Sequence, residues 1–105
     1  MIDRAHLSAQ TFGDPDLARE VLGLFVEQCS ALRPLLGDPA LGRDLRADYA
    51  HTLRGSAVGV GADAVARDCL AFEACLRESR PDADALRSLA VSIDATVRAI
   101  AEWRT

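Results

Sequence analysis

Residues 49–62 of the chain are Tyr49-Ala50-His51-Thr52-Leu53-Arg54-Gly55-Ser56-Ala57-Val58-Gly59-Val60-Gly61-Ala62. The apolar residues around this stretch recur at intervals of four, four and seven, namely Leu45, Tyr49, Leu53 and Val60. This spacing predicts a helix that turns one face toward a core and ends near Gly59 and Gly61. With about 100° between successive residues, His51 lies opposite Leu53 and is expected to point outward.

The outward face around His51 has an unusual composition. Arg54 and Gly55 follow at the third and fourth positions, so both lie beside the imidazole, and Ala47 and Val58 extend this face along the helix. A glycine inside a helix costs roughly 1 kcal/mol relative to alanine, and an exposed valine gains nothing from a wet surface. Both features favour a surface on which another protein docks, because glycine lets a partner approach closely.

Length and composition limit the classes of function. The chain has 105 residues, half of them hydrophobic, and a net charge of −4, which predicts a single domain over residues 1–105. It lacks the basic, aromatic-lined surface typical of nucleic-acid binding. No apolar run approaches the roughly 20 residues that span a bilayer, and the first residues do not resemble a secretion signal. We therefore expect a cytoplasmic protein that binds neither nucleic acid nor membrane.

The cysteines and histidines do not indicate a metal site. The three cysteines, Cys29, Cys69 and Cys75, are odd in number and form no C-x-x-C pair. Cys29 and Cys69 fall in apolar stripes and are predicted to be buried free thiols. His6 has no neighbour that could act with it, so we expect no metal and no cofactor belonging to this chain.

Helical periodicity runs through the whole chain. A short helix is expected over residues 3–9, and Asp14 with Pro15 opens the next, which runs to about residue 33 with an extra turn to 36. Further helices are expected from between 39 and 44 to about 60, from 62 to 77, and from 82 onward. Their apolar stripes include Leu24 in the second helix. We therefore predict an all-α, antiparallel up-down four-helix bundle with a short extra N-terminal helix, present as a monomer.

The segment His51-x-Leu53-Arg54-Gly55-Ser56-Ala57-x-x-Val60-Gly61-Ala62 resembles the signature of histidine-containing phosphotransfer (HPt) domains. That signature has a histidine, a leucine two positions later, then lysine, glycine and small residues, followed by an apolar residue, glycine and alanine. The match is ungapped and differs at one position, where Arg54 replaces the usual lysine. Cys69-x-x-Phe72-Glu73 also resembles the helix that follows in the family.

The resemblance implies a phosphorelay intermediate of two-component signal transduction. His51 would accept a phosphoryl group from a receiver-domain aspartate or a kinase and pass it to a response-regulator receiver. Partners would therefore be receivers and a histidine kinase, bound transiently, with magnesium supplied by the receiver. Such a domain is a carrier without kinase activity of its own. The alanine- and arginine-rich composition hints at a bacterial source.

The resemblance also assigns roles to residues. His51 would be the phosphoacceptor, because neutral imidazole is a nucleophile near pH 7. Arg54 would hold the phosphoryl oxygens. Glu73, 22 residues after His51, resembles the histidine-orienting glutamate of chemotaxis-kinase phosphoacceptor domains, and Asp48 is the alternative. The docking surface would comprise Ala47, Gly55, Val58 and Leu70.

Three other readings remain open at this point. The chain could be an HPt-fold docking module or inhibitor that binds a kinase or receiver without carrying phosphate. It could be a structural α-helical interaction domain in which the motif is coincidental. It could also be the phosphoacceptor domain of a chemotaxis-type kinase, phosphorylated from ATP. Without the family resemblance, the simplest interpretation of Glu73 is a solvated helix residue that pairs with Arg77, four positions later.

Overall fold

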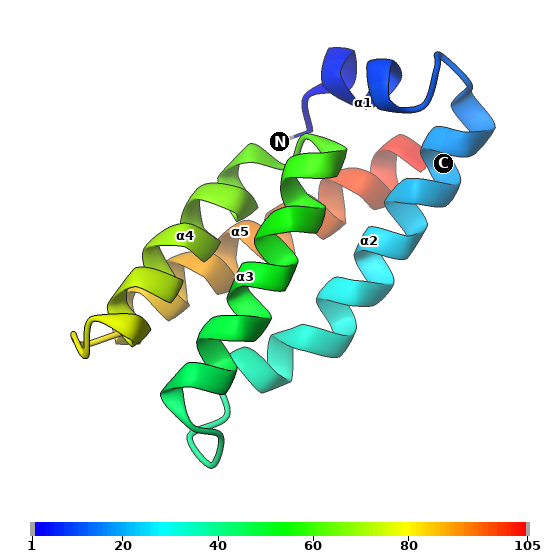
Figure 1. Ribbon diagram of the computed structural model, residues 1–105. Coiled ribbons are helices and arrows are strands. Elements are labelled where there is room, and N and C mark those ends of the chain that lie inside the picture. The colour runs from blue at the N-terminus through cyan, green and yellow to red at the C-terminus, as the bar shows by residue number, and fades with distance from the viewer. Residues whose placement is uncertain (1, 105) are drawn as a thin grey trace.

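The computed structural model describes residues 2–104, and over this range the chain forms helices and no strands. They are α1 (Arg4–Gln10), α2 (Pro15–Leu36), α3 (Arg43–Val60), α4 (Asp63–Arg77) and α5 (Ala83–Arg104). The four long helices lie side by side, and α1 crosses one end of them (Figure 1). The predicted all-α class is therefore confirmed. Within the described range, no helix combines the length and apolar character needed to cross a membrane.

The helix starts follow the capping signals in the sequence. The carboxylate of Asp3 accepts a hydrogen bond from the backbone N–H of His6, and that of Asp14 accepts from Asp16 and Leu17. Pro15 occupies the first position of α2, where its missing N–H costs nothing. Later in the same helix, Pro34 falls in the last turn, and α2 includes the extra turn to Leu36.

The turn between α3 and α4 fixes the hairpin that carries His51. Gly61 has φ +76°, in the left-handed region, and its N–H bonds to Val58 O at 3.2 Å, while Ala62 N–H bonds to Ala57 O at 2.8 Å. A Cβ at Gly61 would lie 3.0 Å from Asp3 O. The chain before α1 closes over this turn, because Asp3 N–H donates to Gly61 O at 2.9 Å.

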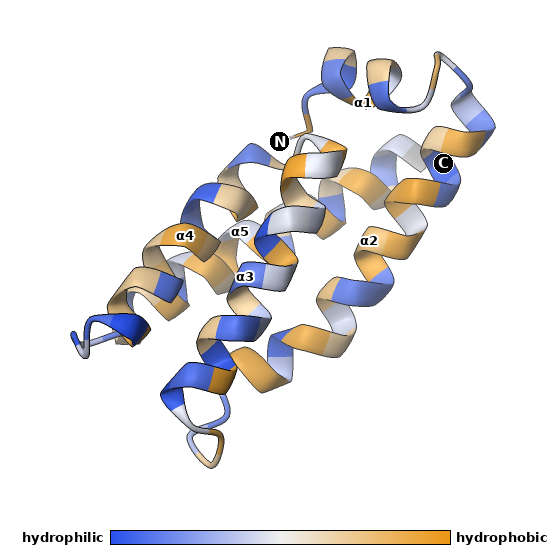
Figure 2. Cartoon of the chain, viewed as in Figure 1, coloured by the Kyte–Doolittle hydropathy of each residue, from blue (hydrophilic) through white to orange (hydrophobic). Residues whose placement is uncertain are grey.

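The core face of α3 is made mostly of small residues. Ala47, Ala50, Leu53 and Ala57 are completely buried. The buried side chains of α4 are larger, namely those of Val65, Cys69, Phe72 and Leu76. Hydrophobic positions recur along each helix with hydrophilic ones between them, as amphipathic packing requires (Figure 2). Small residues on one helix allow the other to approach closely, which brings side chains at the rim of the α3–α4 contact within bonding distance.

A buried arginine anchors the start of α3. The guanidinium of Arg46 donates to Leu36 O at 2.9 Å and to the carboxylate of Asp82 at 2.9 Å. It also lies 5.5 Å from the ring centroid of Phe72. Through these contacts Arg46 ties α3 to the end of α2, to α4 and to the segment that opens α5. Asp82, the residue directly before α5, has its carboxylate paired with this arginine.

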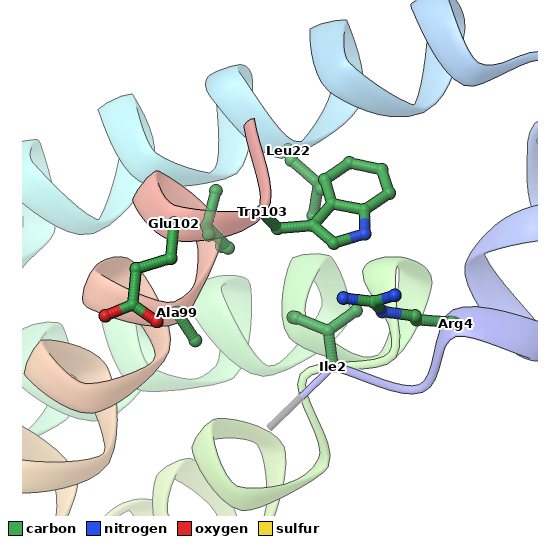
Figure 3. A pocket seen from close by; sticks show the side chains of 7 residues that line it. Ile2, Arg4, Leu22, Ala99, Glu102 and Trp103 are labelled. Atoms are coloured by element: carbon green, nitrogen blue, oxygen red, sulfur yellow. The ribbon is translucent and has the colours of Figure 1, made fainter. Parts of the chain in front are cut away.

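The opposite end of the bundle holds a cavity of about 340 Å³ under α1. Figure 3 shows Arg4 and Trp103 facing each other across it, and the guanidinium lies 5.9 Å from the indole centroid. Trp103 is half-buried and packs against the core. The lining residues come from the N-terminal segment, α2 and α5, so this cavity is separate from the surface around His51.

Candidate functional site

His51 stands on the solvent-facing side of α3, with 65% of its side chain exposed. Its Nδ1 lies 3.2 Å from Oε1 of Glu73, which projects from α4 and is 14% exposed. The structure thus brings together the two residues that the sequence placed 22 positions apart. A partner protein can reach the ring, while the glutamate sits at the edge of the helix–helix contact.

This contact defines which ring nitrogen is free. A carboxylate only accepts hydrogen bonds, so Nδ1 of His51 carries the proton and donates to Glu73. In the neutral ring the lone pair is then on Nε2. The exposed ring therefore keeps one unprotonated nitrogen, which is the form that a nucleophile needs.

The second oxygen of Glu73 is also occupied. Nε of Arg77, one turn later on α4, donates to Oε2 at 2.9 Å. Burial raises the pKa of Glu73, but the hydrogen bonds from Arg77 and His51 and their charges outweigh that effect, so the pKa of Glu73 lies below its ordinary 4.5. The glutamate is therefore ionised at neutral pH and acts as an acceptor toward both partners.

Asp48, the alternative partner for His51, has a different neighbour. Its Oδ1 accepts a hydrogen bond from a terminal nitrogen of Arg77 at 2.8 Å. The ring of His51 is bonded to Glu73 instead. Of the two carboxylates considered from the sequence, the geometry therefore pairs Glu73 with the imidazole.

Arg54 lies one turn after His51 on the same face of α3 and is half-buried. Among residues 2–104 no carboxylate or carbonyl is hydrogen-bonded to its guanidinium. Its five donors are thus available for an anion brought next to the ring, and a planar guanidinium can contact two phosphoryl oxygens at once.

Comparison with known proteins agrees with the family resemblance that the sequence around His51 indicates. Residues 20–103 match the family model of the Hpt domain. The chain belongs to the Hpt domain family. The structure also resembles the crystal structure of the histidine phosphotransferase ShpA from Caulobacter crescentus, with a TM-score of 0.75 and 32% sequence identity, covering 97% of this chain and 88% of that chain. The comparison with curated proteins gave no match.

The surface of this Hpt domain around His51 agrees in part with the docking residues predicted from the sequence. Gly55, Val58 and Leu70 are exposed, and a Cβ added at Gly55 would meet open space. Ala47 was expected on this surface, and that expectation is wrong, because its side chain is completely buried against the core. The error came from assigning the core face of α3 to large residues, including Leu45, which is exposed.

The sequence analysis also missed part of the apolar surface of the Hpt domain. Leu24 was assigned to the core stripe of α2, but 60% of it is exposed. It borders a groove of about 540 Å³ between α2 and α3, which Ser56 and Gly59 line from the α3 side. Leu22 and Phe25 are buried and fill the inner face of α2, so Leu24 has no room on that face. The presence of these two large residues next to Leu24 was the signal that the sequence analysis missed.

The two buried thiols of the Hpt domain do not offer a nucleophile. Cys29 and Cys69 are buried and free, as predicted. Burial raises the pKa of Cys29 to about 11 and, together with neighbouring negative groups, that of Cys69 to about 12. At neutral pH these side chains are protonated and serve as core packing.

Proposed function

We propose that this Hpt domain is a phosphorelay intermediate that accepts a phosphoryl group on His51 and passes it to a response-regulator receiver. The observation that carries the proposal is the pairing of an exposed imidazole with Glu73 through Nδ1, which leaves Nε2 unprotonated and open to a partner. Family membership supports a phosphorelay carrier in general. The likeness to a histidine phosphotransferase points the same way.

The transfer step follows from this geometry. The lone pair of Nε2 attacks the phosphorus of a receiver's aspartyl phosphate, an N–P bond forms, and the P–O bond to the aspartate breaks. The donor carboxylate leaves with the electron pair. Since Nδ1 keeps its proton, the ring of His51 becomes a cation, and the ionised Glu73 next to it stabilises that cation. Transfer to the next receiver reverses these bond changes.

The remaining requirements of phosphoryl transfer are positioning and charge neutralisation. Arg54 would contact the phosphoryl oxygens from the helical turn after His51. Magnesium would come from the receiver, whose own carboxylates suit that ion. On this proposal the Hpt domain is a carrier. The receiver domains supply the metal ion and the aspartates that give up and accept the phosphoryl group.

A receiver would dock on the apolar surface beside His51. Gly55 and Val58 follow His51 on α3, Leu70 lies on α4, and all three are exposed. The groove next to Leu24 extends this surface toward α2. Close approach matters because the reacting atoms must come within about 3–3.5 Å. The open space at Gly55 permits that approach.

The proposal also covers the helix order, the oligomeric state and the cellular location of the protein. The four long helices are joined by short connections, which favours the antiparallel up-down order predicted for α2–α5. We further propose a monomer in the cytoplasm of a bacterium, contacting a histidine kinase and receivers transiently. Release between steps is necessary because the same surface must serve donor and acceptor in turn.

The test is phosphotransfer from a panel of phosphorylated receiver domains to purified protein. The wild type is compared with His51→Gln, and His6→Gln is the control because it removes the chain's other histidine. We expect acid-labile label on the wild type and on His6→Gln, and none on His51→Gln. No label on folded wild-type protein from any active donor would overturn the carrier function and favour a docking module that carries no phosphate.

A further inference from the structure

Arg77 joins the two helices that build the site. Its Nε donates to Oε2 of Glu73 at 2.9 Å, and a terminal nitrogen donates to Oδ1 of Asp48 at 2.8 Å. Glu73 is on the same helix as Arg77, whereas Asp48 is on α3, three residues before His51. The guanidinium therefore spans the rim of the α3–α4 contact directly next to the phosphoacceptor.

We propose that Arg77 is a positioning residue for the phosphoacceptor, holding Glu73 in the orientation that accepts the Nδ1 hydrogen bond of His51. This rests on the proposed function of His51 as phosphoryl carrier. Arg77 acts through Glu73 and needs no contact with the phosphoryl group.

The need for such a residue follows from the flexibility of glutamate. A glutamate side chain has many rotamers, and fixing it in one of them costs conformational entropy. A carboxylate with one partner can still rotate about its last bond, whereas Glu73 has a separate donor on each oxygen, His51 on Oε1 and Arg77 on Oε2. Two bonds in different directions fix the plane of the carboxylate and direct Oε1 at Nδ1.

The second contact of Arg77 explains why an arginine suits this position. Asp48 on α3 accepts a hydrogen bond from the guanidinium of Arg77. The contacts therefore link His51 to Glu73, Glu73 to Arg77 and Arg77 to Asp48, so that both ends of this network lie on α3. The planar guanidinium donates from two nitrogens in fixed directions. A lysine at this position would keep the charge but has one nitrogen with which to serve both carboxylates.

The direct test measures the ring of His51 without any partner protein. Nitrogen-15 NMR reports which ring nitrogen carries the proton, and His6 in α1 is the internal reference. We expect the Nδ1–H form to dominate in the wild type and the Nε2–H form to grow in Arg77→Gln. The control is Arg33→Gln, because Arg33 also forms an ion pair between two helices, with Asp94, and has the same 42% side-chain exposure. An unchanged His51 spectrum in Arg77→Gln would overturn the proposal.

Reactivity is measured with phosphoramidate, a small phosphodonor that needs no docking surface. Nε2 forms the N–P bond while the donor's P–N bond breaks and ammonia leaves, and the bound phosphoryl group is counted by intact mass. We expect Arg77→Gln to slow phosphorylation by about fivefold, because it weakens an orienting contact without removing it. Arg77→Lys should fall between wild type and Arg77→Gln, and Arg33→Gln should react at the wild-type rate.

A double-mutant cycle separates positioning from direct action. If Arg77 acts through Glu73, then Arg77→Gln has no further effect on the rate once Glu73 is replaced by glutamine. Multiplying losses in the double variant would overturn the proposal and assign Arg77 a contact of its own. Failure of the carrier function is a separate result: receivers would then not label the wild type, while the His51 spectrum still decides the role of Arg77.

Discussion

Oε1 of Glu73 lies 3.2 Å from Nδ1 of His51 across the α3–α4 contact, although 22 residues separate the two along the chain. The hairpin turns at Gly61, ten residues after His51 and twelve before Glu73, so the two residues stand at a similar height on neighbouring helices. At 1.5 Å per residue, ten and twelve residues of helix are about 15 and 18 Å long. The near-equal arms of the hairpin thus place the carboxylate opposite the imidazole.

Replacing Glu73 with glutamine tests the value of this contact. The variant keeps the size of the side chain but removes the charge that stabilises the phosphorylated ring, so we expect phosphorylation of His51 to slow by about tenfold or more. Rates with phosphoramidate are compared with those of Glu78→Gln, in which the exposed end of α4 loses a carboxylate that pairs with Arg80. Equal rates in the two variants would show that the contact has no role in reactivity.

The lowered pKa of Glu73 predicts an acid-sensitive contribution to stability. Because the folded-state pKa lies below the ordinary 4.5, the ionised carboxylate stabilises the folded protein at pH values above 4.5, and this stability is lost as the pH falls through the folded-state pKa. Urea unfolding of wild type and Glu73→Gln should therefore show a difference at pH 7 that shrinks toward pH 3. A constant difference over this range would contradict the assignment.

The sequence predicted the His51–Glu73 pair through its resemblance to chemotaxis-kinase phosphoacceptor domains. The structure shows the physical reason, which is that regular helices and one turn set the relative height of the two residues. Asp48 was the weaker alternative, and its carboxylate bonds to Arg77. The choice between the two carboxylates depends on side-chain rotamers. Arg77 was recognised only as an i+4 partner of Glu73. Its second bond, to Asp48, crosses from α4 to α3, and no periodicity within one helix reports such a contact.

The wrong assignments share one physical origin. Ala47 was placed outside and Leu24 inside because large apolar residues were taken to mark the core. A helix that packs closely against its neighbour buries alanines instead, as α3 does against α4. On α2, Leu22 and Phe25 fill the inner face, so Leu24 stays at the surface and borders the groove between α2 and α3.

Gly55→Gln separates docking from chemistry. A side chain at this position meets open space, so the fold should be kept, and glutamine is a better helix former than glycine by roughly 0.5–1 kcal/mol. We expect phosphoramidate to label His51 at the wild-type rate, while transfer from a receiver slows by about tenfold because the partner's backbone is held away. Gly55→Ala is the smaller control. Unchanged transfer in Gly55→Gln would exclude this face from docking.

The three cysteines should differ in their reaction with iodoacetamide. Cys29 and Cys69 are buried, and burial raises the pKa of their thiols to about 11 and about 12, whereas Cys75 is only half-buried. We expect peptide mass mapping after treatment of the folded protein at pH 8 to find Cys75 modified first. All three should react at similar rates in urea. Early modification of Cys69 in the native protein would contradict its burial.

Arg46→Met tests the anchor at the start of α3. Methionine fills much of the volume but leaves the carboxylate of Asp82 without its closest partner and Leu36 O without its donor. We expect a loss of about 2 kcal/mol and a fall in Tm of roughly 10 °C. This loss is smaller than the roughly 3–5 kcal/mol of a fully buried broken pair, because Asp82 keeps some solvent contact. The control is Arg33→Met, which breaks an exposed ion pair with Asp94 and should cost about 1 kcal/mol or less. Thermal unfolding followed by circular dichroism measures both.

Phosphorylation of His51 by phosphoramidate at low temperature should remain in Arg46→Met, because the anchor stabilises α3 without touching the imidazole. Equal Tm values for Arg46→Met and Arg33→Met would contradict the anchoring role.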